Sequence, residues 1–229
     1  MSDTTALVPR HLGIILDGNR RWAKAHGLPI TDGHRKGLDA FKEVSLAAFD
    51  RGIEYVSAYI FSIENWKRTQ DEVSFLMGLV VKGVEKTLNS FHEADIKLVM
   101  LGSREGLDKK VLQTIDRAVE MTKDNNRGTL ALCFNYGGQQ EIADAAQALA
   151  GKGEAITPDT LAAALYQPDV PPIDFVVRTS GEERLSGFML WRAAYAELYF
   201  TDTLWPDFST KDLDIALTKY ADRQRRFGS

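Results

Sequence analysis

Short apolar runs alternate with longer amphipathic segments along the 229 residues of this chain. Each run is four to nine residues long and rich in β-branched or aromatic side chains, as is typical of buried strands. These runs predict six strands. They are residues 11–16, 53–61, 96–101, 129–134, 173–177 and 197–200.

Three segments between these runs carry apolar side chains three or four positions apart, the spacing that places them on one face of a helix. They are residues 38–48, after which the sequence Asp50-Arg51-Gly52 ends the helix, residues 73–91 and residues 111–122. Strands and helices that alternate in this way form a mostly parallel sheet with helices on both faces. We therefore expect an α/β fold with a mostly parallel, six-stranded sheet flanked by helices.

One domain, residues 1–229, is expected to account for the whole chain. With 44% hydrophobic and 26% charged residues, the chain can bury one substantial core. Only residues 151–158 and 167–172 are predicted to be loops of any length. Residues 1–10 are expected to form a flexible N-terminus. They are too weakly apolar for a signal peptide, and no run reaches the roughly 20 apolar residues that span a bilayer, so we expect a cytoplasmic protein.

The charge balance favours small anionic ligands over nucleic acid. A net charge of −4 and a pI near 5.6 disfavour non-specific nucleic-acid binding, whereas local clusters of arginine can still hold small anions. The single cysteine, Cys133, excludes an intramolecular disulfide. Because it lies within an apolar run, we interpret it as a small buried hydrophobe and not as a catalytic thiol.

The first candidate site follows the first predicted strand. Residues 16–22 have the sequence Leu-Asp-Gly-Asn-Arg-Arg-Trp. Asp17 can bind Mg²⁺, Arg20 and Arg21 can neutralise phosphate oxygens, and backbone N–H groups at a strand end can face a ligand. Taken alone, the segment is equally consistent with a strand-ending turn and a solvated basic flank.

A second candidate site follows the second predicted strand. Residues 61–68 place a hydroxyl (Ser62), an amide (Asn65) and a guanidinium beside a tryptophan, which suits a substrate with an apolar body and a charged end. The alternative is a helix cap: Ser62 with Asn65, or Thr69 with Glu72, could simply begin the next helix.

Two C-terminal segments add charged groups. Residues 178–186 carry two arginines and three hydroxyls around a glycine and look like a diphosphate clamp, because each guanidinium can bind phosphate oxygens bidentately. An exposed loop with Glu-Arg pairs is the alternative. Glu197 lies in the aromatic, nearly uncharged stretch 191–200 and needs a cation, a metal or an arginine as partner, and an ordinary salt bridge would satisfy it equally well.

Polar residues thus follow four of the predicted strands: Asp17, Ser62, Asn135 and Arg178. Ligands of parallel sheets bind beyond the carboxyl ends of the strands. We therefore expect these residues to meet at one site.

Five segments together resemble the signature regions of the cis-prenyltransferases, the undecaprenyl diphosphate synthase family of isoprenyl transferases. The resemblance implies a homodimer with a hydrophobic tunnel. It also implies Mg²⁺-dependent condensation of isopentenyl diphosphate with an allylic diphosphate, such as geranyl or farnesyl diphosphate, in cis geometry. Peripheral membrane contact would arise only through the lipid product. The segments are residues 11–34, 61–68, 135–138, 178–186 and 191–228.

The resemblance also implies roles for single residues. Asp17 is the essential carboxylate and a Mg²⁺ ligand, Glu197 completes the metal site, and residues 223–228 approach the partner subunit. Asn65 stands at the position of the proton acceptor, but an amide is a very weak base, so we interpret Asn65 as positioning a phosphate oxygen or water that takes the proton. The implied substrate-binding residues are Gly18, Asn19, Arg20, Arg21, Trp22, His34, Ser62, Ile63, Glu64, Trp66, Arg68, Arg178, Arg184, Leu185 and Ser186.

Several positions depart from the long-chain bacterial pattern. Arg20 replaces a glycine and Ile30 replaces a phosphate-binding arginine, so Arg20 can compensate for Ile30. Glu183 stands where a histidine near the metal is common, and Ser180 and Gly187 are further changes.

A dry tunnel is expected beside residues 73–81, which contain no charged side chain. Phe41 and Phe75 are bulkier than their usual counterparts, which favours a product of short or medium length if they line the tunnel. Ordinary core packing explains each lining candidate as well. The candidates are Phe41, Phe75, Leu76, Met77 and Leu132.

The alternatives separate by motif. The chain lacks the Asp-Asp-x-x-Asp motif of a trans-type synthase and the Gly-Lys-Ser/Thr motif of a P-loop enzyme. A non-catalytic partner subunit would be expected to lack Asp17, the glycine loop or the arginine clamp, all of which are present. Irregular coupling or cyclisation of two five-carbon diphosphates on the same fold stays open, as do the allylic primer and the chain length.

Overall fold

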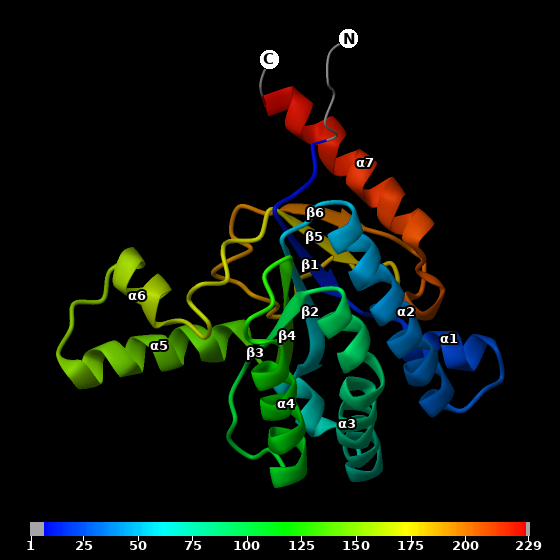
Figure 1. The fold of residues 1–229 in the computed structure, drawn as a ribbon, viewed down its shortest axis with the longest axis horizontal. Coiled ribbons are helices and arrows are strands. Elements are labelled where there is room, and N and C mark those ends of the chain that lie inside the picture. Colours follow the sequence, from blue (N-terminus) through cyan, green and yellow to red (C-terminus); the bar gives the residue numbers. More distant parts are fainter. Residues whose placement is uncertain (1–6, 228–229) are drawn as a thin grey trace.

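Six strands form one sheet in the order β3-β4-β2-β1-β5-β6, and every neighbouring pair is parallel (Figure 1). The computed structural model describes residues 7–227, with side chains as far as Arg223. The six strands lie at the six predicted apolar runs, so the expected α/β fold is confirmed. They are β1 (His11–Ile15), β2 (Tyr55–Ser62), β3 (Ile96–Leu101), β4 (Gly128–Tyr136), β5 (Phe175–Arg178) and β6 (Glu197–Phe200).

Helices α2, α3 and α4 contain the three predicted helical segments, and α1, α5, α6 and α7 are additional. Helix α5 extends into the segment 151–158 that was predicted to be a loop, and α6 begins at its end. The helices are α1 (Asn19–Ala25), α2 (Ile30–Asp50), α3 (Gln70–Glu93), α4 (Lys109–Thr122), α5 (Gly138–Lys152), α6 (Pro158–Ala164) and α7 (Thr210–Phe227), with the 3-10 helices η1 (Ile63–Lys67) and η2 (Trp205–Asp207).

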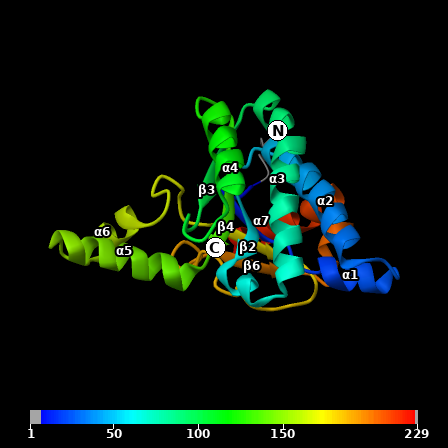
Figure 2. The same cartoon turned by 90° about the horizontal axis from the view of Figure 1, so that it is seen from below.

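The two faces of the sheet are covered differently. Helices α2, α3, α4 and α7 all pack on one face, and Figure 2 shows α2, α3 and α4 on the same side of the strands. The other face is covered largely by two irregular segments, one before β5 that contributes Val170 and Ile173, and one after it that contributes Phe188 and Met189. The sequence pattern predicted helices on both faces. Left-handed backbone at Ser186, Gly187 and Met189 keeps the connection between β5 and β6 from forming a helix.

The central strands are hydrophobic because both of their faces are covered. All five residues of β1 are buried, as expected for a strand inside a parallel sheet. Cys133 in β4 is fully buried and packs in the core, which confirms its interpretation as a small core residue. Among residues 7–227, no helix has both the length and the apolar character that a bilayer crossing requires. Of the N-terminal residues expected to be flexible, residues 1–6 lie outside the described part of the chain.

Candidate active site

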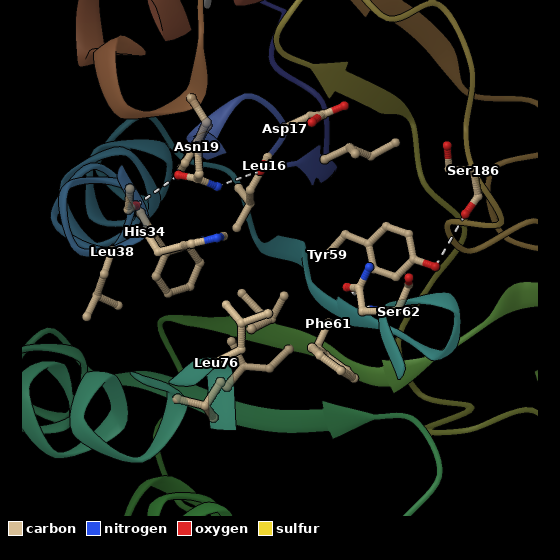
Figure 3. A pocket seen from close by; sticks show the side chains of 18 of the residues that line it. Leu16, Asp17, Asn19, His34, Leu38, Tyr59, Phe61, Ser62, Leu76 and Ser186 are labelled. Carbon is tan, nitrogen blue, oxygen red and sulfur yellow. Dashed lines mark hydrogen bonds between the residues drawn. The ribbon is translucent and has the colours of Figure 1, made fainter. Parts of the chain in front are cut away.

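A cavity of about 1100 Å³ lies on the helical face, between α2, α3 and the sheet. Its apolar part, here called the depth, includes residues from the middle of β3 and β4, whereas its polar part, the mouth, follows the carboxyl ends of β1, β2 and β5. Figure 3 shows Asp17 and Ser186 at the mouth, with Leu38 and Leu76 from the two helices.

The mouth is polar and charged, whereas the depth is lined almost entirely by apolar side chains. The mouth is lined by Asp17, Gly18, Asn19, Arg20, Arg21, His34, Ser62, Glu64, Asn65, Arg68, Gln139, Arg178, Glu182, Arg184 and Ser186. The depth is lined by Leu38, Phe41, Ile60, Phe61, Leu76, Leu79, Val80, Val84, Phe91, Leu98, Leu130 and Leu132. Such a cavity suits a molecule with an anionic head and an apolar tail.

The loop between β1 and α1 is seated against α2 by two glycines. A Cβ at Gly33 would lie 2.1 Å from the Asn19 carbonyl oxygen, and a Cβ at Gly37 would lie 2.1 Å from Asn19 Oδ1. Gly18 makes the turn into α1 with a φ of 112°, and Asn19 Nδ2 donates to the Leu16 carbonyl at 3.1 Å. Close contact of α2 with both the backbone and the side chain of Asn19 therefore holds the first residue of α1 in place.

Arg178 joins the first and third candidate segments. Pairing of β1 with β5 places Arg178 beside Ile15, and its Nη2 donates to Asp17 Oδ2 at 2.9 Å. Its Nη1 donates to Ser186 Oγ at 2.8 Å, and only 5% of the side chain is exposed. A guanidinium this buried needs its carboxylate partner, so Asp17 and Arg178 form one unit.

Two glutamates pair with the other four arginines of the mouth. Each glutamate contacts two guanidinium groups, so the mouth holds two separate clusters of positive charge. Arg20 lines the cavity, whereas Ile30 is exposed and does not. The pairs are Arg21–Glu182 at 3.2 Å, Arg184–Glu182 at 2.5 Å, Arg68–Glu72 at 2.7 Å and Arg20–Glu72 at 3.9 Å.

His34 lies where the mouth meets the depth. Burial, and secondly the nearby Arg68, lower the pKa of His34 to about 4, so its ring is neutral at pH 7. Within the described residues, His34 Nε2 and Asn19 Oδ1 are buried and have no hydrogen-bond partner. Asn19 Oδ1 packs against Gly37, whereas His34 Nε2 is an unpartnered polar atom beside the cavity and is available to a ligand.

The second candidate segment is both a helix cap and part of the cavity wall. Ser62 and Asn65 form a capping box at the start of η1, and the Ser62 N–H donates to Asn65 Oδ1 at 3.0 Å. Thr69 caps α3 by accepting from the Glu72 N–H. The structural alternative is thus correct, yet Ser62 and Asn65 also line the mouth.

Four predicted substrate-binding residues lie outside the cavity lining. Trp22 donates through Nε1 to Asp207 at 2.7 Å, and Trp66 donates through Nε1 to Asn135 at 2.7 Å. Asn135 is occupied in this contact and does not line the cavity, so the predicted convergence holds for three of the four strand-end residues. The four residues that do not line the cavity are Trp22, Ile63, Trp66 and Leu185.

Glu197 does not meet Asp17 within one chain. It begins β6, in register with Phe175 at the start of β5, whereas Arg178 at the end of β5 lies at the mouth. Its carboxylate pairs with Arg223 at 2.9 Å. The described residues contain no group of three or more His, Cys, Asp or Glu side chains that could hold a metal. The side chains of the tail after Arg223, expected to approach a partner, lie outside the described part.

The tunnel prediction is partly correct. Phe41, Leu76 and Leu132 line the cavity, but Phe75 and Met77 do not. The Phe75 ring lies 6.3 Å from the His34 ring and under the Arg35 guanidinium, so it faces α2 outside the cavity lining. Met77 packs in the core with Phe61 and Phe134. One side of α3 forms part of the cavity wall, whereas the residues next to Leu76 in the sequence point away from the cavity.

Several residues that line the cavity were not predicted from the sequence. Leu38 shares the helical spacing of Phe41 and could have been found from it. Tyr59 gave no such signal: its ring lies at the mouth, its hydroxyl is 3.3 Å from the Tyr136 and Ser186 carbonyl oxygens, and burial raises its pKa. Glu182 lies within a predicted segment but was not singled out.

Comparisons with known proteins show the family of this chain. Residues 15–228 match the family described as putative undecaprenyl diphosphate synthase. An isoprenyl transferase of Neisseria gonorrhoeae is 46% identical over 222 residues, which cover 96% of this chain and 90% of that protein. A trans,polycis-polyprenyl diphosphate synthase of Thermobifida fusca, specific for (2Z,6E)-farnesyl diphosphate, is 46% identical over 97% of this chain and 81% of its own.

Solved structures show the same fold. Lavandulyl diphosphate synthase from Lavandula x intermedia, in complex with dimethylallyl diphosphate, superposes with a TM-score of 0.91 and 31% identity, over 96% of this chain and 97% of that one. A probable undecaprenyl diphosphate synthase from Campylobacter jejuni superposes with a TM-score of 0.82 and 28% identity, over 96% and 99% of the two chains. This chain therefore belongs to the undecaprenyl diphosphate synthase family and is a prenyltransferase.

Proposed function

We propose that this protein condenses isopentenyl diphosphate with an allylic diphosphate, in cis geometry, to give a Z-prenyl or Z-polyprenyl diphosphate. One observation carries the proposal: a single cavity has five guanidinium groups at its mouth and a continuous apolar wall in its depth. Two clusters of positive charge suit two diphosphate groups, and the depth suits the hydrocarbon chain.

The mouth residues support departure of diphosphate from the allylic substrate. Breaking the allylic C–O bond places growing negative charge on the leaving group, and fixed guanidinium groups stabilise that charge. Arg178 is already oriented by Asp17 and Ser186, so it needs little reorganisation. The apolar depth keeps water away from the cationic allylic fragment.

Asp17 fits a magnesium site of the kind that substrate completes. Arg178 contacts Oδ2, and within the described residues Oδ1 has no hydrogen-bond partner. Mg²⁺ is commonly held by one or two carboxylates together with substrate phosphates, so a single carboxylate at this mouth fits the ion. When bound, Mg²⁺ would neutralise charge on the departing diphosphate.

Asn65 is proposed to position a proton acceptor. Its Oδ1 accepts from the Ser62 N–H, which leaves the amide Nδ2 as the group able to face substrate. An amide nitrogen donates a hydrogen bond and does not take a proton at neutral pH. A phosphate oxygen or water held by Asn65 is therefore the better proton acceptor.

A second candidate function is coupling of two five-carbon diphosphates. It is favoured by the TM-score of 0.91 to lavandulyl diphosphate synthase, a relative solved with dimethylallyl diphosphate. The cavity of about 1100 Å³ favours elongation instead, because it exceeds what two five-carbon chains need.

Mass-resolved product analysis separates the two functions. Purified protein is incubated with Mg²⁺, labelled isopentenyl diphosphate and one primer, which is dimethylallyl, geranyl or farnesyl diphosphate in separate reactions. A further reaction contains dimethylallyl diphosphate without isopentenyl diphosphate. Metal-dependent addition of one or more five-carbon units to a primer supports the elongation reaction. A ten-carbon product formed from dimethylallyl diphosphate alone supports coupling. No product from any combination would contradict both and favour a non-catalytic partner role.

We further propose a cytoplasmic homodimer that meets the membrane only through its lipid product. Strand β6 ends the sheet with half-buried side chains, and the nearby Tyr195 is fully exposed, so this edge is suited to a second copy. Light scattering during size-exclusion chromatography would give the mass of the particle. A mass near the 25.5 kDa of one chain would contradict the dimer.

A further inference from the structure

One carboxylate links helix α1 to the loop after β5 at the mouth. Glu182 Oε1 lies 3.2 Å from Arg21 Nη2, and Glu182 Oε2 lies 2.5 Å from Arg184 Nη1. Arg21 belongs to α1, directly after β1, whereas Arg184 belongs to the loop after β5. The two oxygens of Glu182 thus pair with one guanidinium group from α1 and one from the loop after β5.

A constrained turn places Glu182 between these arginines. Ser180 has a φ of 76°, which is unusual for a residue with a side chain, and Gly181 follows with a φ of 72°. The Ser180 N–H donates to the Thr203 carbonyl and the Gly181 N–H to the Thr201 carbonyl, both at 2.8 Å. The Ser180 hydroxyl also accepts from Arg21 Nη2. The turn therefore holds Glu182 and Arg21 together.

The Glu182 contacts are of a kind that an incoming anion can replace. The side chains of Arg21 and Arg184 are 50% and 60% exposed, against 30% for Glu182, and all three line the cavity. Exposed ion pairs are weak, and a diphosphate carries more charge than a carboxylate and binds guanidinium groups bidentately. By contrast, Arg178 is only 5% exposed and keeps its partner Asp17.

We propose that Glu182 is a counter-ion shared by Arg21 and Arg184, which diphosphate displaces on binding and which displaces diphosphate on release. The proposal rests on the proposed function, because it assumes that the mouth binds diphosphate groups. Glu182 then lowers the affinity of the mouth for diphosphate and speeds the release of inorganic pyrophosphate.

A purely structural role of Glu182 predicts the opposite change in affinity for diphosphate when Glu182 is replaced. If Glu182 only braced Arg21 and Arg184 in a gripping position, its loss would loosen both guanidinium groups and weaken anion binding. If it competes with the ligand, its neutralisation frees two guanidinium groups and strengthens binding. Each exposed ion pair is worth about a 1.4- to fivefold change in an equilibrium constant, so two pairs multiply to about two- to 25-fold, and we expect about three- to tenfold from the middle of that range.

The test is calorimetric titration of inorganic pyrophosphate, with Mg²⁺, into the full chain. Glu182→Gln keeps the shape of the side chain and removes its charge. Glu154→Gln is the control, because Glu154 is exposed, lies outside the cavity lining, has no ion pair within the described residues and undergoes the same change of charge. We expect Glu182→Gln to bind pyrophosphate about three- to tenfold more tightly than Glu154→Gln. Equal or weaker binding would overturn the proposal.

Steady-state kinetics give a second readout. We expect Glu182→Gln to lower both KM for isopentenyl diphosphate and kcat, with stronger inhibition by pyrophosphate, since binding tightens and release slows. A raised KM would indicate a brace and overturn the proposal. If thermal melting shows that Glu182→Gln is unfolded, Glu182→Ala carries the same test of sign.

The titration also separates this inference from the proposed function, because it requires no turnover. If the unaltered protein binds no pyrophosphate, the proposed function and the counter-ion role both fail. If the unaltered protein binds pyrophosphate and makes product, but Glu182→Gln does not bind more tightly, only the counter-ion role fails.

Discussion

The mouth and the depth of the cavity are built by different means. Most mouth residues come from the strand ends and the segments that directly follow them, where short local sequences place charged groups and glycines side by side. Depth residues come from the inner faces of α2 and α3 and from β2, β3 and β4, where only packing decides which side chain faces the cavity. The charged groups are therefore concentrated in motifs, whereas the walls that would limit substrate size are spread over helices and strands. Each region is expected to fail in its own way when altered.

The largest expected effect comes from the mouth. Asp17→Asn keeps a hydrogen-bond acceptor for Arg178 but removes the charge that would hold Mg²⁺. We expect turnover to fall by about 100-fold or more, the usual scale for losing an electrostatic group at a reacting centre. Incorporation of labelled isopentenyl diphosphate measures it, and circular dichroism checks the fold. Asp39→Asn, which alters an exposed pair with Lys86, is the control. Normal turnover in Asp17→Asn would contradict the role of Asp17.

A matched pair of phenylalanines probes the depth. Phe41 is buried and lines the cavity, whereas Phe75 lies outside it. We expect Phe41→Ala to lengthen the product and to cost about 3 kcal/mol of unfolding free energy, because a large core side chain is removed. Phe75→Ala should leave the product distribution unchanged. Mass spectrometry of the products and denaturant unfolding measure the two effects. A longer product from Phe75→Ala alone would reverse this assignment.

Acid titration compares the pKa of a histidine in the cavity lining, His34, with that of a histidine buried at the start of β1, His11. Burial lowers the pKa of both His34 and His11 from 6.5 to about 4. The unfolded chain therefore binds more protons between those values, so this stability is complete above about pH 6.5 and is lost as the pH falls toward 4. For the buried His11 the loss is on the order of 3 kcal/mol.

Denaturant unfolding at several pH values would measure that loss. His11 is held by Ser57 and by Pro171, far from the mouth, so His11→Gln should remove part of the acid sensitivity without changing the product. A histidine titration by NMR that gave either residue a pKa near 6.5 would refute the expectation.

The smallest expected effect is a change in stability on adding a methyl group to α3, at an exposed glycine or at one that faces the cavity wall. No atom lies within 4 Å of a Cβ added at Gly78, whereas a Cβ at Gly83 would lie 3.0 Å from Leu38 in the cavity wall. We expect Gly78→Ala to stabilise the protein by up to about 1 kcal/mol, because alanine favours a helix. Gly83→Ala should stabilise the protein less than Gly78→Ala does. Thermal melting measures both, and a lower melting temperature for Gly78→Ala would contradict its open surroundings.

The sequence predicted the sheet and the mouth better than the depth. Apolar runs mark buried strands directly, and polar groups after β1, β2 and β5 meet because parallel strands end at one edge. Phe75 was misplaced because helical spacing shows which residues share a face but not what that face contacts. Glu197 begins a parallel strand and so lies away from the edge where Asp17 stands, which the direction of the strand alone could have shown. Helices α1 and α6 were missed because seven residues give too little periodicity.

The two glycines of α2 have a consequence for mutational tolerance. Gly33 and Gly37 offer no functional group, yet a side chain at Gly33 would overlap the Asn19 backbone and push the β1–α1 loop outward, and one at Gly37 would displace the Asn19 side chain and crowd Trp205. In a saturation library selected for activity, these positions should be as intolerant as those that carry charge. The absence of side chains at two positions of α2 thus lets the β1–α1 loop pack closely against this helix.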